Sequence, residues 1–218
     1  MSVNAQPAAT AERPALRGVL HTFAAGLAIG GAVLLMLLAD KPAGYAGGAV
    51  FAISLMLLYG TSASYHQIPW GPTPRRIVKR VDHSMIYVLI AGTYTPFCLD
   101  IQLAWGIPML VIVWTLAGIG TLTAVAWPNA PRWLSVGLYF GLGWVGIVAV
   151  SEAFDQYFGS PLVLLLVGGT LYTVGGIVYG LRRPDPWPRV FGFHEVFHSF
   201  VVAGSAVHYA AIAIYVVR

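Results

Sequence analysis

The chain has 218 residues, of which 58% are hydrophobic and only 9% are charged. An average soluble domain has about 25% charged residues, so this chain lacks the polar side chains needed to cover a water-exposed surface. The composition therefore excludes a soluble globular domain, a disordered chain and a coiled coil, and it indicates a protein whose outside faces lipid. The formal net charge of +4 is typical of the loop bias of membrane proteins, and no nucleic-acid partner is expected.

The chain order of polar and apolar segments predicts an all-α fold. Residues 1–18 are polar and are expected to form a disordered cytoplasmic tail, followed by a single membrane domain over residues 19–218. Seven apolar segments of that domain exceed or approach the roughly 20 residues that a helix needs to cross a bilayer, and none alternates like a barrel strand. They are Val19–Ala39, Gly44–Tyr65, His83–Leu99, Leu103–Trp127, Trp133–Val150, Pro161–Leu181 and Val196–Val217.

The basic residues orient this predicted bundle of seven transmembrane helices. With seven spans, ten of the 12 Lys and Arg residues fall on one side of the membrane, and only Lys41 and Arg218 fall on the other. Basic residues accumulate on the cytoplasmic side of membrane proteins. We therefore expect a cytoplasmic N-terminus and an outside C-terminus in the inner cell membrane, opposite to G-protein-coupled receptors. The ten are Arg13, Arg17, Arg75, Arg76, Lys79, Arg80, Arg132, Arg182, Arg183 and Arg189.

Three histidines near the cytoplasmic ends of two spans suggest a metal site. His194 and His198 are four residues apart, so on a helix they face the same way, one turn above the other. His66 ends the second span and would complete a set of three nitrogen ligands. Three protein ligands and one water describe a catalytic zinc site. Imidazole also binds nickel, copper and iron, so residue type alone leaves the metal open.

Two further polar residues lie at the same predicted membrane boundary. Asp82 begins the third span, and its carboxylate could bind a zinc-bound water or orient it as a base. Ser62 lies one turn before His66 on the same helix face and could hydrogen-bond in the same pocket. A lone histidine at a helix end is more often satisfied by headgroups or water. Ionisable groups gathered from three spans favour a functional site.

The segment HEVFH at 194–198 also matches the metalloprotease pattern H-E-x-x-H, in which Glu195 would be the general base. We disfavour this interpretation because the helix continues into an apolar span, whereas the pattern belongs to soluble domains with a third ligand downstream. Glu195 lies about 100° around the helix from His194 and is expected to face the membrane boundary or the basic loop.

The remaining three histidines are placed outside the predicted set of ligands. His21, near the cytoplasmic end of the first span, has no evident partner. His83 points about 100° away from Asp82, and His208 lies about 15 Å deeper along the helix than His198.

Three stretches of this sequence resemble bacterial hemolysin III-type proteins of the progestin and adipoQ receptor family, which includes the adiponectin receptors. They are SASYH at 62–66, VDHSMIYVLIAGTYTP at 81–96 and HEVFHSFVVAGSAVHY at 194–209. The same trio of motifs is similar to the wider superfamily that contains alkaline ceramidases. The resemblance implies a zinc ion held by His66, His194 and His198, with Asp82 contacting it through water and Ser62 beside it.

The resemblance also implies a lipid-accessible cavity inside the bundle and, for some relatives, hydrolysis of a ceramide-like amide. We therefore expect a zinc-dependent hydrolase acting on the amide or ester of a membrane lipid. Two alternatives stay open at this point. One is a receptor-like sensor of membrane homeostasis with structural zinc, and the other is a hemolysin or pore. The substrate and the oligomeric state are not predicted by the sequence.

Overall fold

The computed structural model of the protein describes residues 13–101, 103–146, 157 and 159–218. Within these ranges the chain is helical and contains no β-strand, which confirms the predicted all-α class. The seven helices of the described residues are α1 (Val19–Leu38), α2 (Pro42–Gln67), α3 (Pro72–Asp100), α4 (Leu103–Ala126), α5 (Arg132–Trp144), α7 (Ser160–Leu181) and α8 (Phe193–Tyr215).

Five of these helices, namely α1, α2, α4, α7 and α8, are long and apolar enough to cross a membrane. Together with the composition, they identify a multi-pass membrane protein. The helix α3 is longer than the predicted span His83–Leu99 and begins at Pro72, because proline suits the first turn of a helix and the basic residues that follow it are good helix formers. The predicted fifth span ends at Val150, and its residues 147–150 lie outside the described part of the chain.

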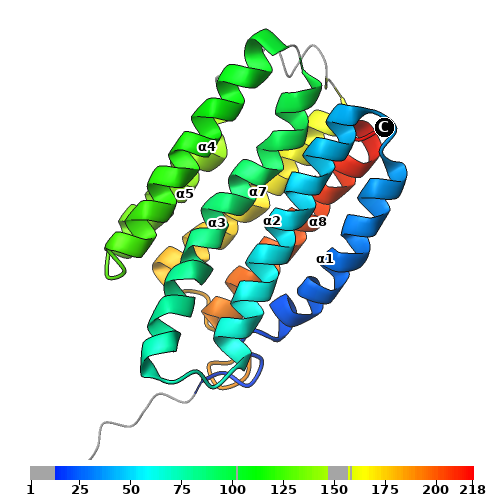
Figure 1. Ribbon diagram of the computed structural model, residues 1–218. Helices are drawn as coiled ribbons and strands as arrows, with labels where there is room; N and C mark the ends of the chain where they lie inside the picture. The colour runs from blue at the N-terminus through cyan, green and yellow to red at the C-terminus, as the bar shows by residue number, and fades with distance from the viewer. Residues whose placement is uncertain (1–12, 102, 147–156, 158) are drawn as a thin grey trace, which may run out of the picture.

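The helices form a bundle in which consecutive segments lie side by side (Figure 1). The helix α2 packs between α1 and α3, α4 packs on α3, and α7 packs on α8. The helix α1 also contacts α8, so the first and last helices are neighbours. As a result, the start of α1, the end of α2, the start of α3, the end of α7 and the start of α8 gather at one end of the bundle (Figure 1).

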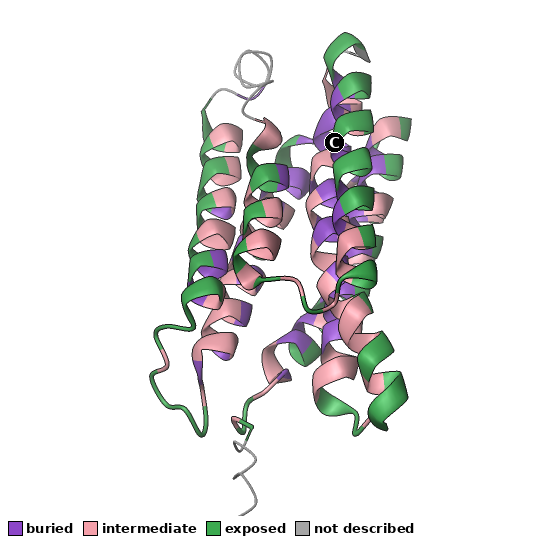
Figure 2. Ribbon diagram, turned by 90° about the vertical axis from the view of Figure 1, so that its left-hand side faces the viewer, coloured by how far each residue is buried: buried purple, intermediate pink, exposed green. Residues whose placement is uncertain are grey.

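Many exposed positions of the described helices, drawn green in Figure 2, carry large apolar side chains, unlike the surface of a soluble protein. Large apolar side chains on α1 point outward, and Phe23, Leu27 and Leu37 are 72%, 76% and 77% exposed. Buried positions include polar side chains such as His21, Ser62 and His198. So large an apolar exterior is stable where hydrocarbon replaces water as the solvent, and the buried polar side chains then have to find partners inside the protein.

Part of the segment expected to be a disordered tail is structured. Ala15 and Leu16 donate backbone hydrogen bonds to the carbonyl oxygens of Arg189 and Val190, at 2.9 and 3.1 Å. Ala15 and Leu16 therefore lie against the loop between α7 and α8, and the expectation of disorder does not hold for this part of the tail. Residues 1–12 of the predicted tail are outside the described residues.

A close helix contact between α2 and α3 depends on a glycine. A Cβ atom added to Gly47 would lie 2.5 Å from the Cα atom of Pro96, whereas Gly60, in the same helix, has no neighbour within 4 Å. Small residues of this kind let helices approach in lipid.

We predict that Gly47→Ala lowers the thermal stability of the purified protein, because the new methyl group pushes α2 and α3 apart. Gly60→Ala is the matched control and should leave the melting temperature unchanged or slightly higher, since alanine favours a helix by about 1 kcal/mol over glycine. Thermal unfolding in detergent measures both variants. Equal melting temperatures for the two variants would show that the close contact at Gly47 does not determine the thermal stability of the protein.

Candidate metal centre

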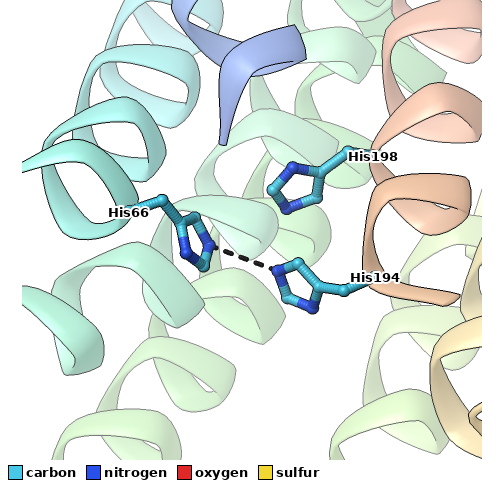
Figure 3. A group of neighbouring side chains, drawn as sticks. All are labelled: His66, His194 and His198. Carbon is cyan, nitrogen blue, oxygen red and sulfur yellow. Dashed lines mark hydrogen bonds between the residues drawn. The ribbon is translucent and has the colours of Figure 1, made fainter. Parts of the chain in front are cut away.

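The structure brings the three predicted histidines together from two helices (Figure 3). His66 lies in the last turn of α2, and His194 and His198 lie in the first two turns of α8. One ring nitrogen from each histidine lies within 4.8 Å of the other two. The Nε2 atoms of His66 and His194 are 3.2 Å apart.

This arrangement fits a divalent metal ion. Two nitrogen ligands of a tetrahedral zinc ion, each about 2.0 to 2.1 Å from it, lie roughly 3.3 Å from each other. The distance between His66 and His194 is close to that value. His198 is 3% exposed, and its Nδ1 atom is buried with no hydrogen-bond partner in the described part of the protein. An uncharged, nitrogen-only set of this kind suits zinc and other late first-row metals.

Ser62 and Asp82 line a small cavity beside the histidines. The cavity has a volume of about 30 Å³, and His194 and His198 form part of its wall. This exceeds the roughly 10 to 15 Å³ that one water molecule requires, and the wall offers several polar groups. Asp82 does not belong to the group of ligand atoms that lie within 4.8 Å of one another. Its position beside the cavity is compatible with contact to a metal through water rather than directly.

His21 is the residue of this site that sequence reasoning missed. It lies in the first turn of α1, its Nδ1 atom is 2.8 Å from Ser62 Oγ, and its ring stacks on His198 with 3.6 Å between centroids and 7° between planes. The sequence offered one usable signal. With seven spans, the start of the first span and the end of the second lie on the same side of the membrane, at the same depth as the other histidines.

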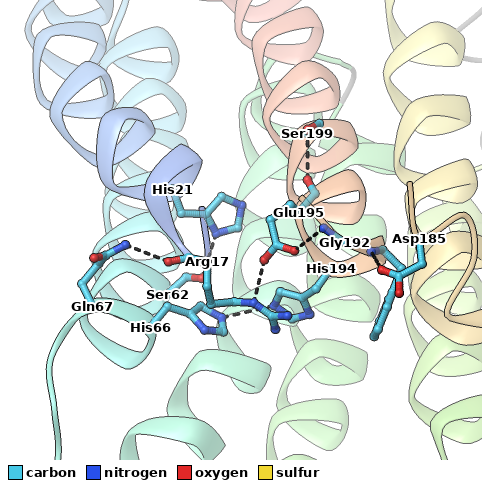
Figure 4. Close-up of polar contacts among 11 residues, drawn as sticks. Arg17, His21, Ser62, His66, Gln67, Asp185, Gly192, His194, Glu195 and Ser199 are labelled. Carbon is cyan, nitrogen blue, oxygen red and sulfur yellow. Dashed lines mark hydrogen bonds and ion pairs between the residues drawn. The ribbon is translucent and has the colours of Figure 1, made fainter. Parts of the chain in front are cut away.

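Glu195 has a structural role in the HEVFH segment (Figure 4). Its side chain is 1% exposed, and its Oε2 atom accepts a hydrogen bond of 2.9 Å from the backbone N–H of Gly192, which caps the start of α8. Its Oε1 atom lies 2.6 Å from Nε of Arg17. Both carboxylate oxygens are therefore engaged by the protein, which argues against Glu195 as the general base of a protease.

The two other histidines lie apart from the three-nitrogen cluster. His83 lines the small cavity, and its backbone carbonyl accepts a hydrogen bond of 3.3 Å from the Tyr139 hydroxyl. His208 lies 3.1 Å, through Nε2, from the carbonyl oxygen of Leu165. His208 also lines a second, larger cavity.

The larger cavity has a volume of about 320 Å³ and a mainly aliphatic and aromatic wall. Polar groups in this wall form hydrogen bonds with other protein groups. The Tyr94 hydroxyl, for example, donates to the Gly143 carbonyl at 2.6 Å. The two cavities adjoin, because they share the lining residues Leu58, Ile86, Tyr139, Phe197 and Val201. An apolar chamber therefore lies directly beside the histidine cluster.

Comparison with known proteins gives a consistent set of relatives. Residues 9–209 match the family described as haemolysin-III related. The hemolysin-3 homolog of Bacillus subtilis (strain 168) is 38% identical over 170 residues, covering 78% of this chain and 76% of that protein. Hemolysin-3 of Bacillus cereus is 33% identical over 202 residues, covering 91% and 89%. The adiponectin receptor protein of Drosophila melanogaster is 27% identical over 183 residues, covering 76% of this chain and 40% of that protein.

The cluster predicts one divalent metal ion per chain. Replacing His66, His194 or His198 by Ala should reduce bound metal from stoichiometric to near zero, because each change removes one of three ligands. His208→Ala is the matched control, since it removes an imidazole from the same helix outside the cluster. Mass spectrometry of protein purified without chelators measures the metal content. Equal metal in the ligand variants and the control would exclude this site.

Proposed function

The chain belongs to the haemolysin-III-related family, and we propose that this member is an integral-membrane zinc hydrolase that cleaves an amide or ester of a membrane lipid. The observation that carries the proposal is the convergence of three imidazole nitrogens next to a carboxyl group and an apolar chamber. The first two features are typical of a hydrolytic zinc site, and the third suits a substrate with a hydrocarbon chain.

In this proposal His66, His194 and His198 hold the zinc ion. Bound zinc supplies two kinds of chemistry, since it lowers the pKa of a coordinated water towards neutrality and polarises a carbonyl oxygen. Three histidine ligands would leave a zinc ion able to bind a water or a substrate as well.

Asp82 is the proposed general base and acid. Its carboxylate lines the small cavity and takes a proton from the attacking water as the water oxygen bonds to the carbonyl carbon. Asp82 then returns that proton to the leaving nitrogen or oxygen as its bond to carbon breaks, which releases a fatty acid and an amine or alcohol. Ser62 lines the same cavity as Asp82, and its Oγ atom lies 2.8 Å from the Nδ1 atom of His21. We assign to Ser62 the orientation of Asp82 and a hydrogen bond to the carbonyl oxygen as charge develops on it.

The larger cavity is the proposed site of the acyl chain. Phe197 and Val201 line both cavities, and they lie on α8 beside or one turn beyond the proposed ligand His198. A substrate with its carbonyl group at the histidines therefore has a direct path for its hydrocarbon chain into the bundle. A ceramide-like lipid suits both cavities, because it combines an amide group with long apolar chains.

The proposed site faces the cytoplasm. Arg17 contacts the start of α8, and Arg75 lies 5.0 Å from the ring centroid of Tyr65, next to His66. The end of the bundle that carries the histidines therefore also carries the basic residues that are expected on the cytoplasmic side. A substrate would then enter from the inner leaflet.

The relatives' names support an alternative, which is a receptor-like sensor with structural zinc, because one of them is called an adiponectin receptor protein. The names of the Bacillus proteins suggest a hemolysin or a pore. A sensor would need the metal for its structure but would not hydrolyse lipid. A pore would pass ions across a planar bilayer.

We predict that Asp82→Asn lowers the rate of fatty-acid release from a ceramide or related lipid by about 100- to 10,000-fold, because the amide cannot accept the proton. Its zinc content should equal that of the wild type, since Asp82 is not a direct ligand. The assay uses purified protein with zinc in detergent or vesicles and a panel of ceramides and lipid esters.

Asp40→Asn is the matched control for this test. Asp40 is an exposed aspartate in the loop between α1 and α2, at the other end of the bundle. Full activity of Asp40→Asn with loss in Asp82→Asn supports the proposal. Wild-type protein that carries zinc but releases no fatty acid from any lipid of the panel would contradict the proposed hydrolase activity and favour the sensor.

A further inference from the structure

The two helices that carry the proposed ligands are held together largely by a third helix that carries none. Over the described residues, α2 and α8 pack little on each other, whereas α1 packs along α2 and also contacts α8. The distance between His66 and the pair on α8 therefore depends on contacts made by α1 and by the residues just before it. We call residues 17–21, from Arg17 to His21, the N-terminal clamp.

The clamp is joined to α8 through an ion pair (Figure 4). Arg17 Nε lies 2.6 Å from Oε1 of Glu195, whose carboxylate is almost fully buried. Glu195 lies directly after His194 and one turn before Ser199, whose hydroxyl bonds back to the Glu195 carbonyl at 3.0 Å. An ion pair at a buried carboxylate is screened by water and salt much less than one at the surface, so it links the first turn of α8 to the clamp.

The clamp is joined to α2 through its backbone. The side-chain amide of Gln67 donates a hydrogen bond of 2.8 Å to the carbonyl oxygen of Arg17. Gly18 has a φ of +80° and lies directly on His66, so that an added Cβ atom would overlap the Cβ atom of the histidine. Only glycine combines this backbone conformation with so close an approach.

His21 closes the clamp at the level of the cluster. Its Nδ1 atom is 2.8 Å from Ser62 Oγ on α2, and its ring lies flat against His198 on α8 at 3.6 Å. The buried side chain of His21 thus touches both helices. On α2 it contacts Ser62, one turn from His66, and on α8 it contacts the proposed ligand His198 directly.

We propose that Arg17, Gly18 and His21 are positioning residues, which set the spacing of His66 against His194 and His198 and thereby the metal affinity and coordination geometry. The proposal rests on the proposed metal site but not on hydrolysis. Glu195 then has a defined role as the anchor of the clamp on α8. Residues that contact and orient metal ligands without binding the metal typically contribute about 10- to 100-fold to metal affinity.

The test measures zinc affinity by competition with a chromophoric chelator, and the visible absorption spectrum of the cobalt-substituted protein, in the full chain in detergent. Arg17→Ala, Gly18→Ala and His21→Ala should each weaken zinc binding by about 10- to 100-fold and change the cobalt bands, which report coordination geometry. His21→Phe keeps a flat ring against His198 and should recover part of the loss.

Two further measurements separate positioning from general damage to the fold. Phe23→Ala is the matched control, since Phe23 is an aromatic residue two positions after His21 that is 72% exposed. It should bind zinc like the wild type. The loss in the double variant Arg17→Ala with Glu195→Gln should equal the loss in Arg17→Ala alone, because both changes break one pair.

Zinc affinity and cobalt spectra like those of the wild type in Arg17→Ala, Gly18→Ala and His21→Ala would overturn the clamp, even if lipid hydrolysis is confirmed. A wild-type protein that binds no zinc would overturn the metal site and the clamp together. A wild type that binds zinc without hydrolysing lipids, with weakened binding in the clamp variants, would establish the clamp and reject only the hydrolase.

Discussion

One ring nitrogen from each of three imidazoles, at the end of α2 and the start of α8, lies within 4.8 Å of the other two, and the arrangement depends on the contacts that join these helix ends. The cluster lies at one end of a bundle whose exterior is hydrocarbon-like, so its polar groups have to be satisfied inside the protein. Ser62, His21 and Glu195 are each buried and each has a partner from another element. A metal ion would use the nitrogen lone pairs that these contacts leave directed at one point.

The same constraint explains why so much of the architecture could be predicted from the sequence. In a bilayer each span must be a long apolar helix. Seven apolar segments and the placement of ten basic residues were therefore enough to predict a helical membrane bundle, although they do not show how the helices pack. The spacing of His194 and His198 was informative because one helical turn fixes their direction. His66 could be added because the alternation of spans brings the end of the second span to the start of the last.

What the sequence did not reveal depends on how helices are rotated and packed against each other. Hydropathy shows that His21 lies near a membrane boundary, but its stacking on His198 requires α1 to contact α8, which are far apart in the chain. Arg17 and Gly18 are in a polar stretch that composition alone indicates to be disordered, yet they are held by a buried carboxylate and a close glycine contact. The helix α3 begins eleven residues before the predicted span because backbone hydrogen bonding does not stop where hydrophobicity does.

The proposed chemistry and the N-terminal clamp both depend on the three histidines being ligands of one zinc ion. Zinc K-edge X-ray absorption of the protein purified without chelators tests this assignment most directly, since it reports the number, type and distance of the atoms around the metal. We predict three imidazole nitrogens and one oxygen at about 2.0 to 2.1 Å, with the imidazole signal reduced in His198→Ala. A spectrum with sulfur ligands, with mainly oxygen ligands, or without any zinc would contradict the account.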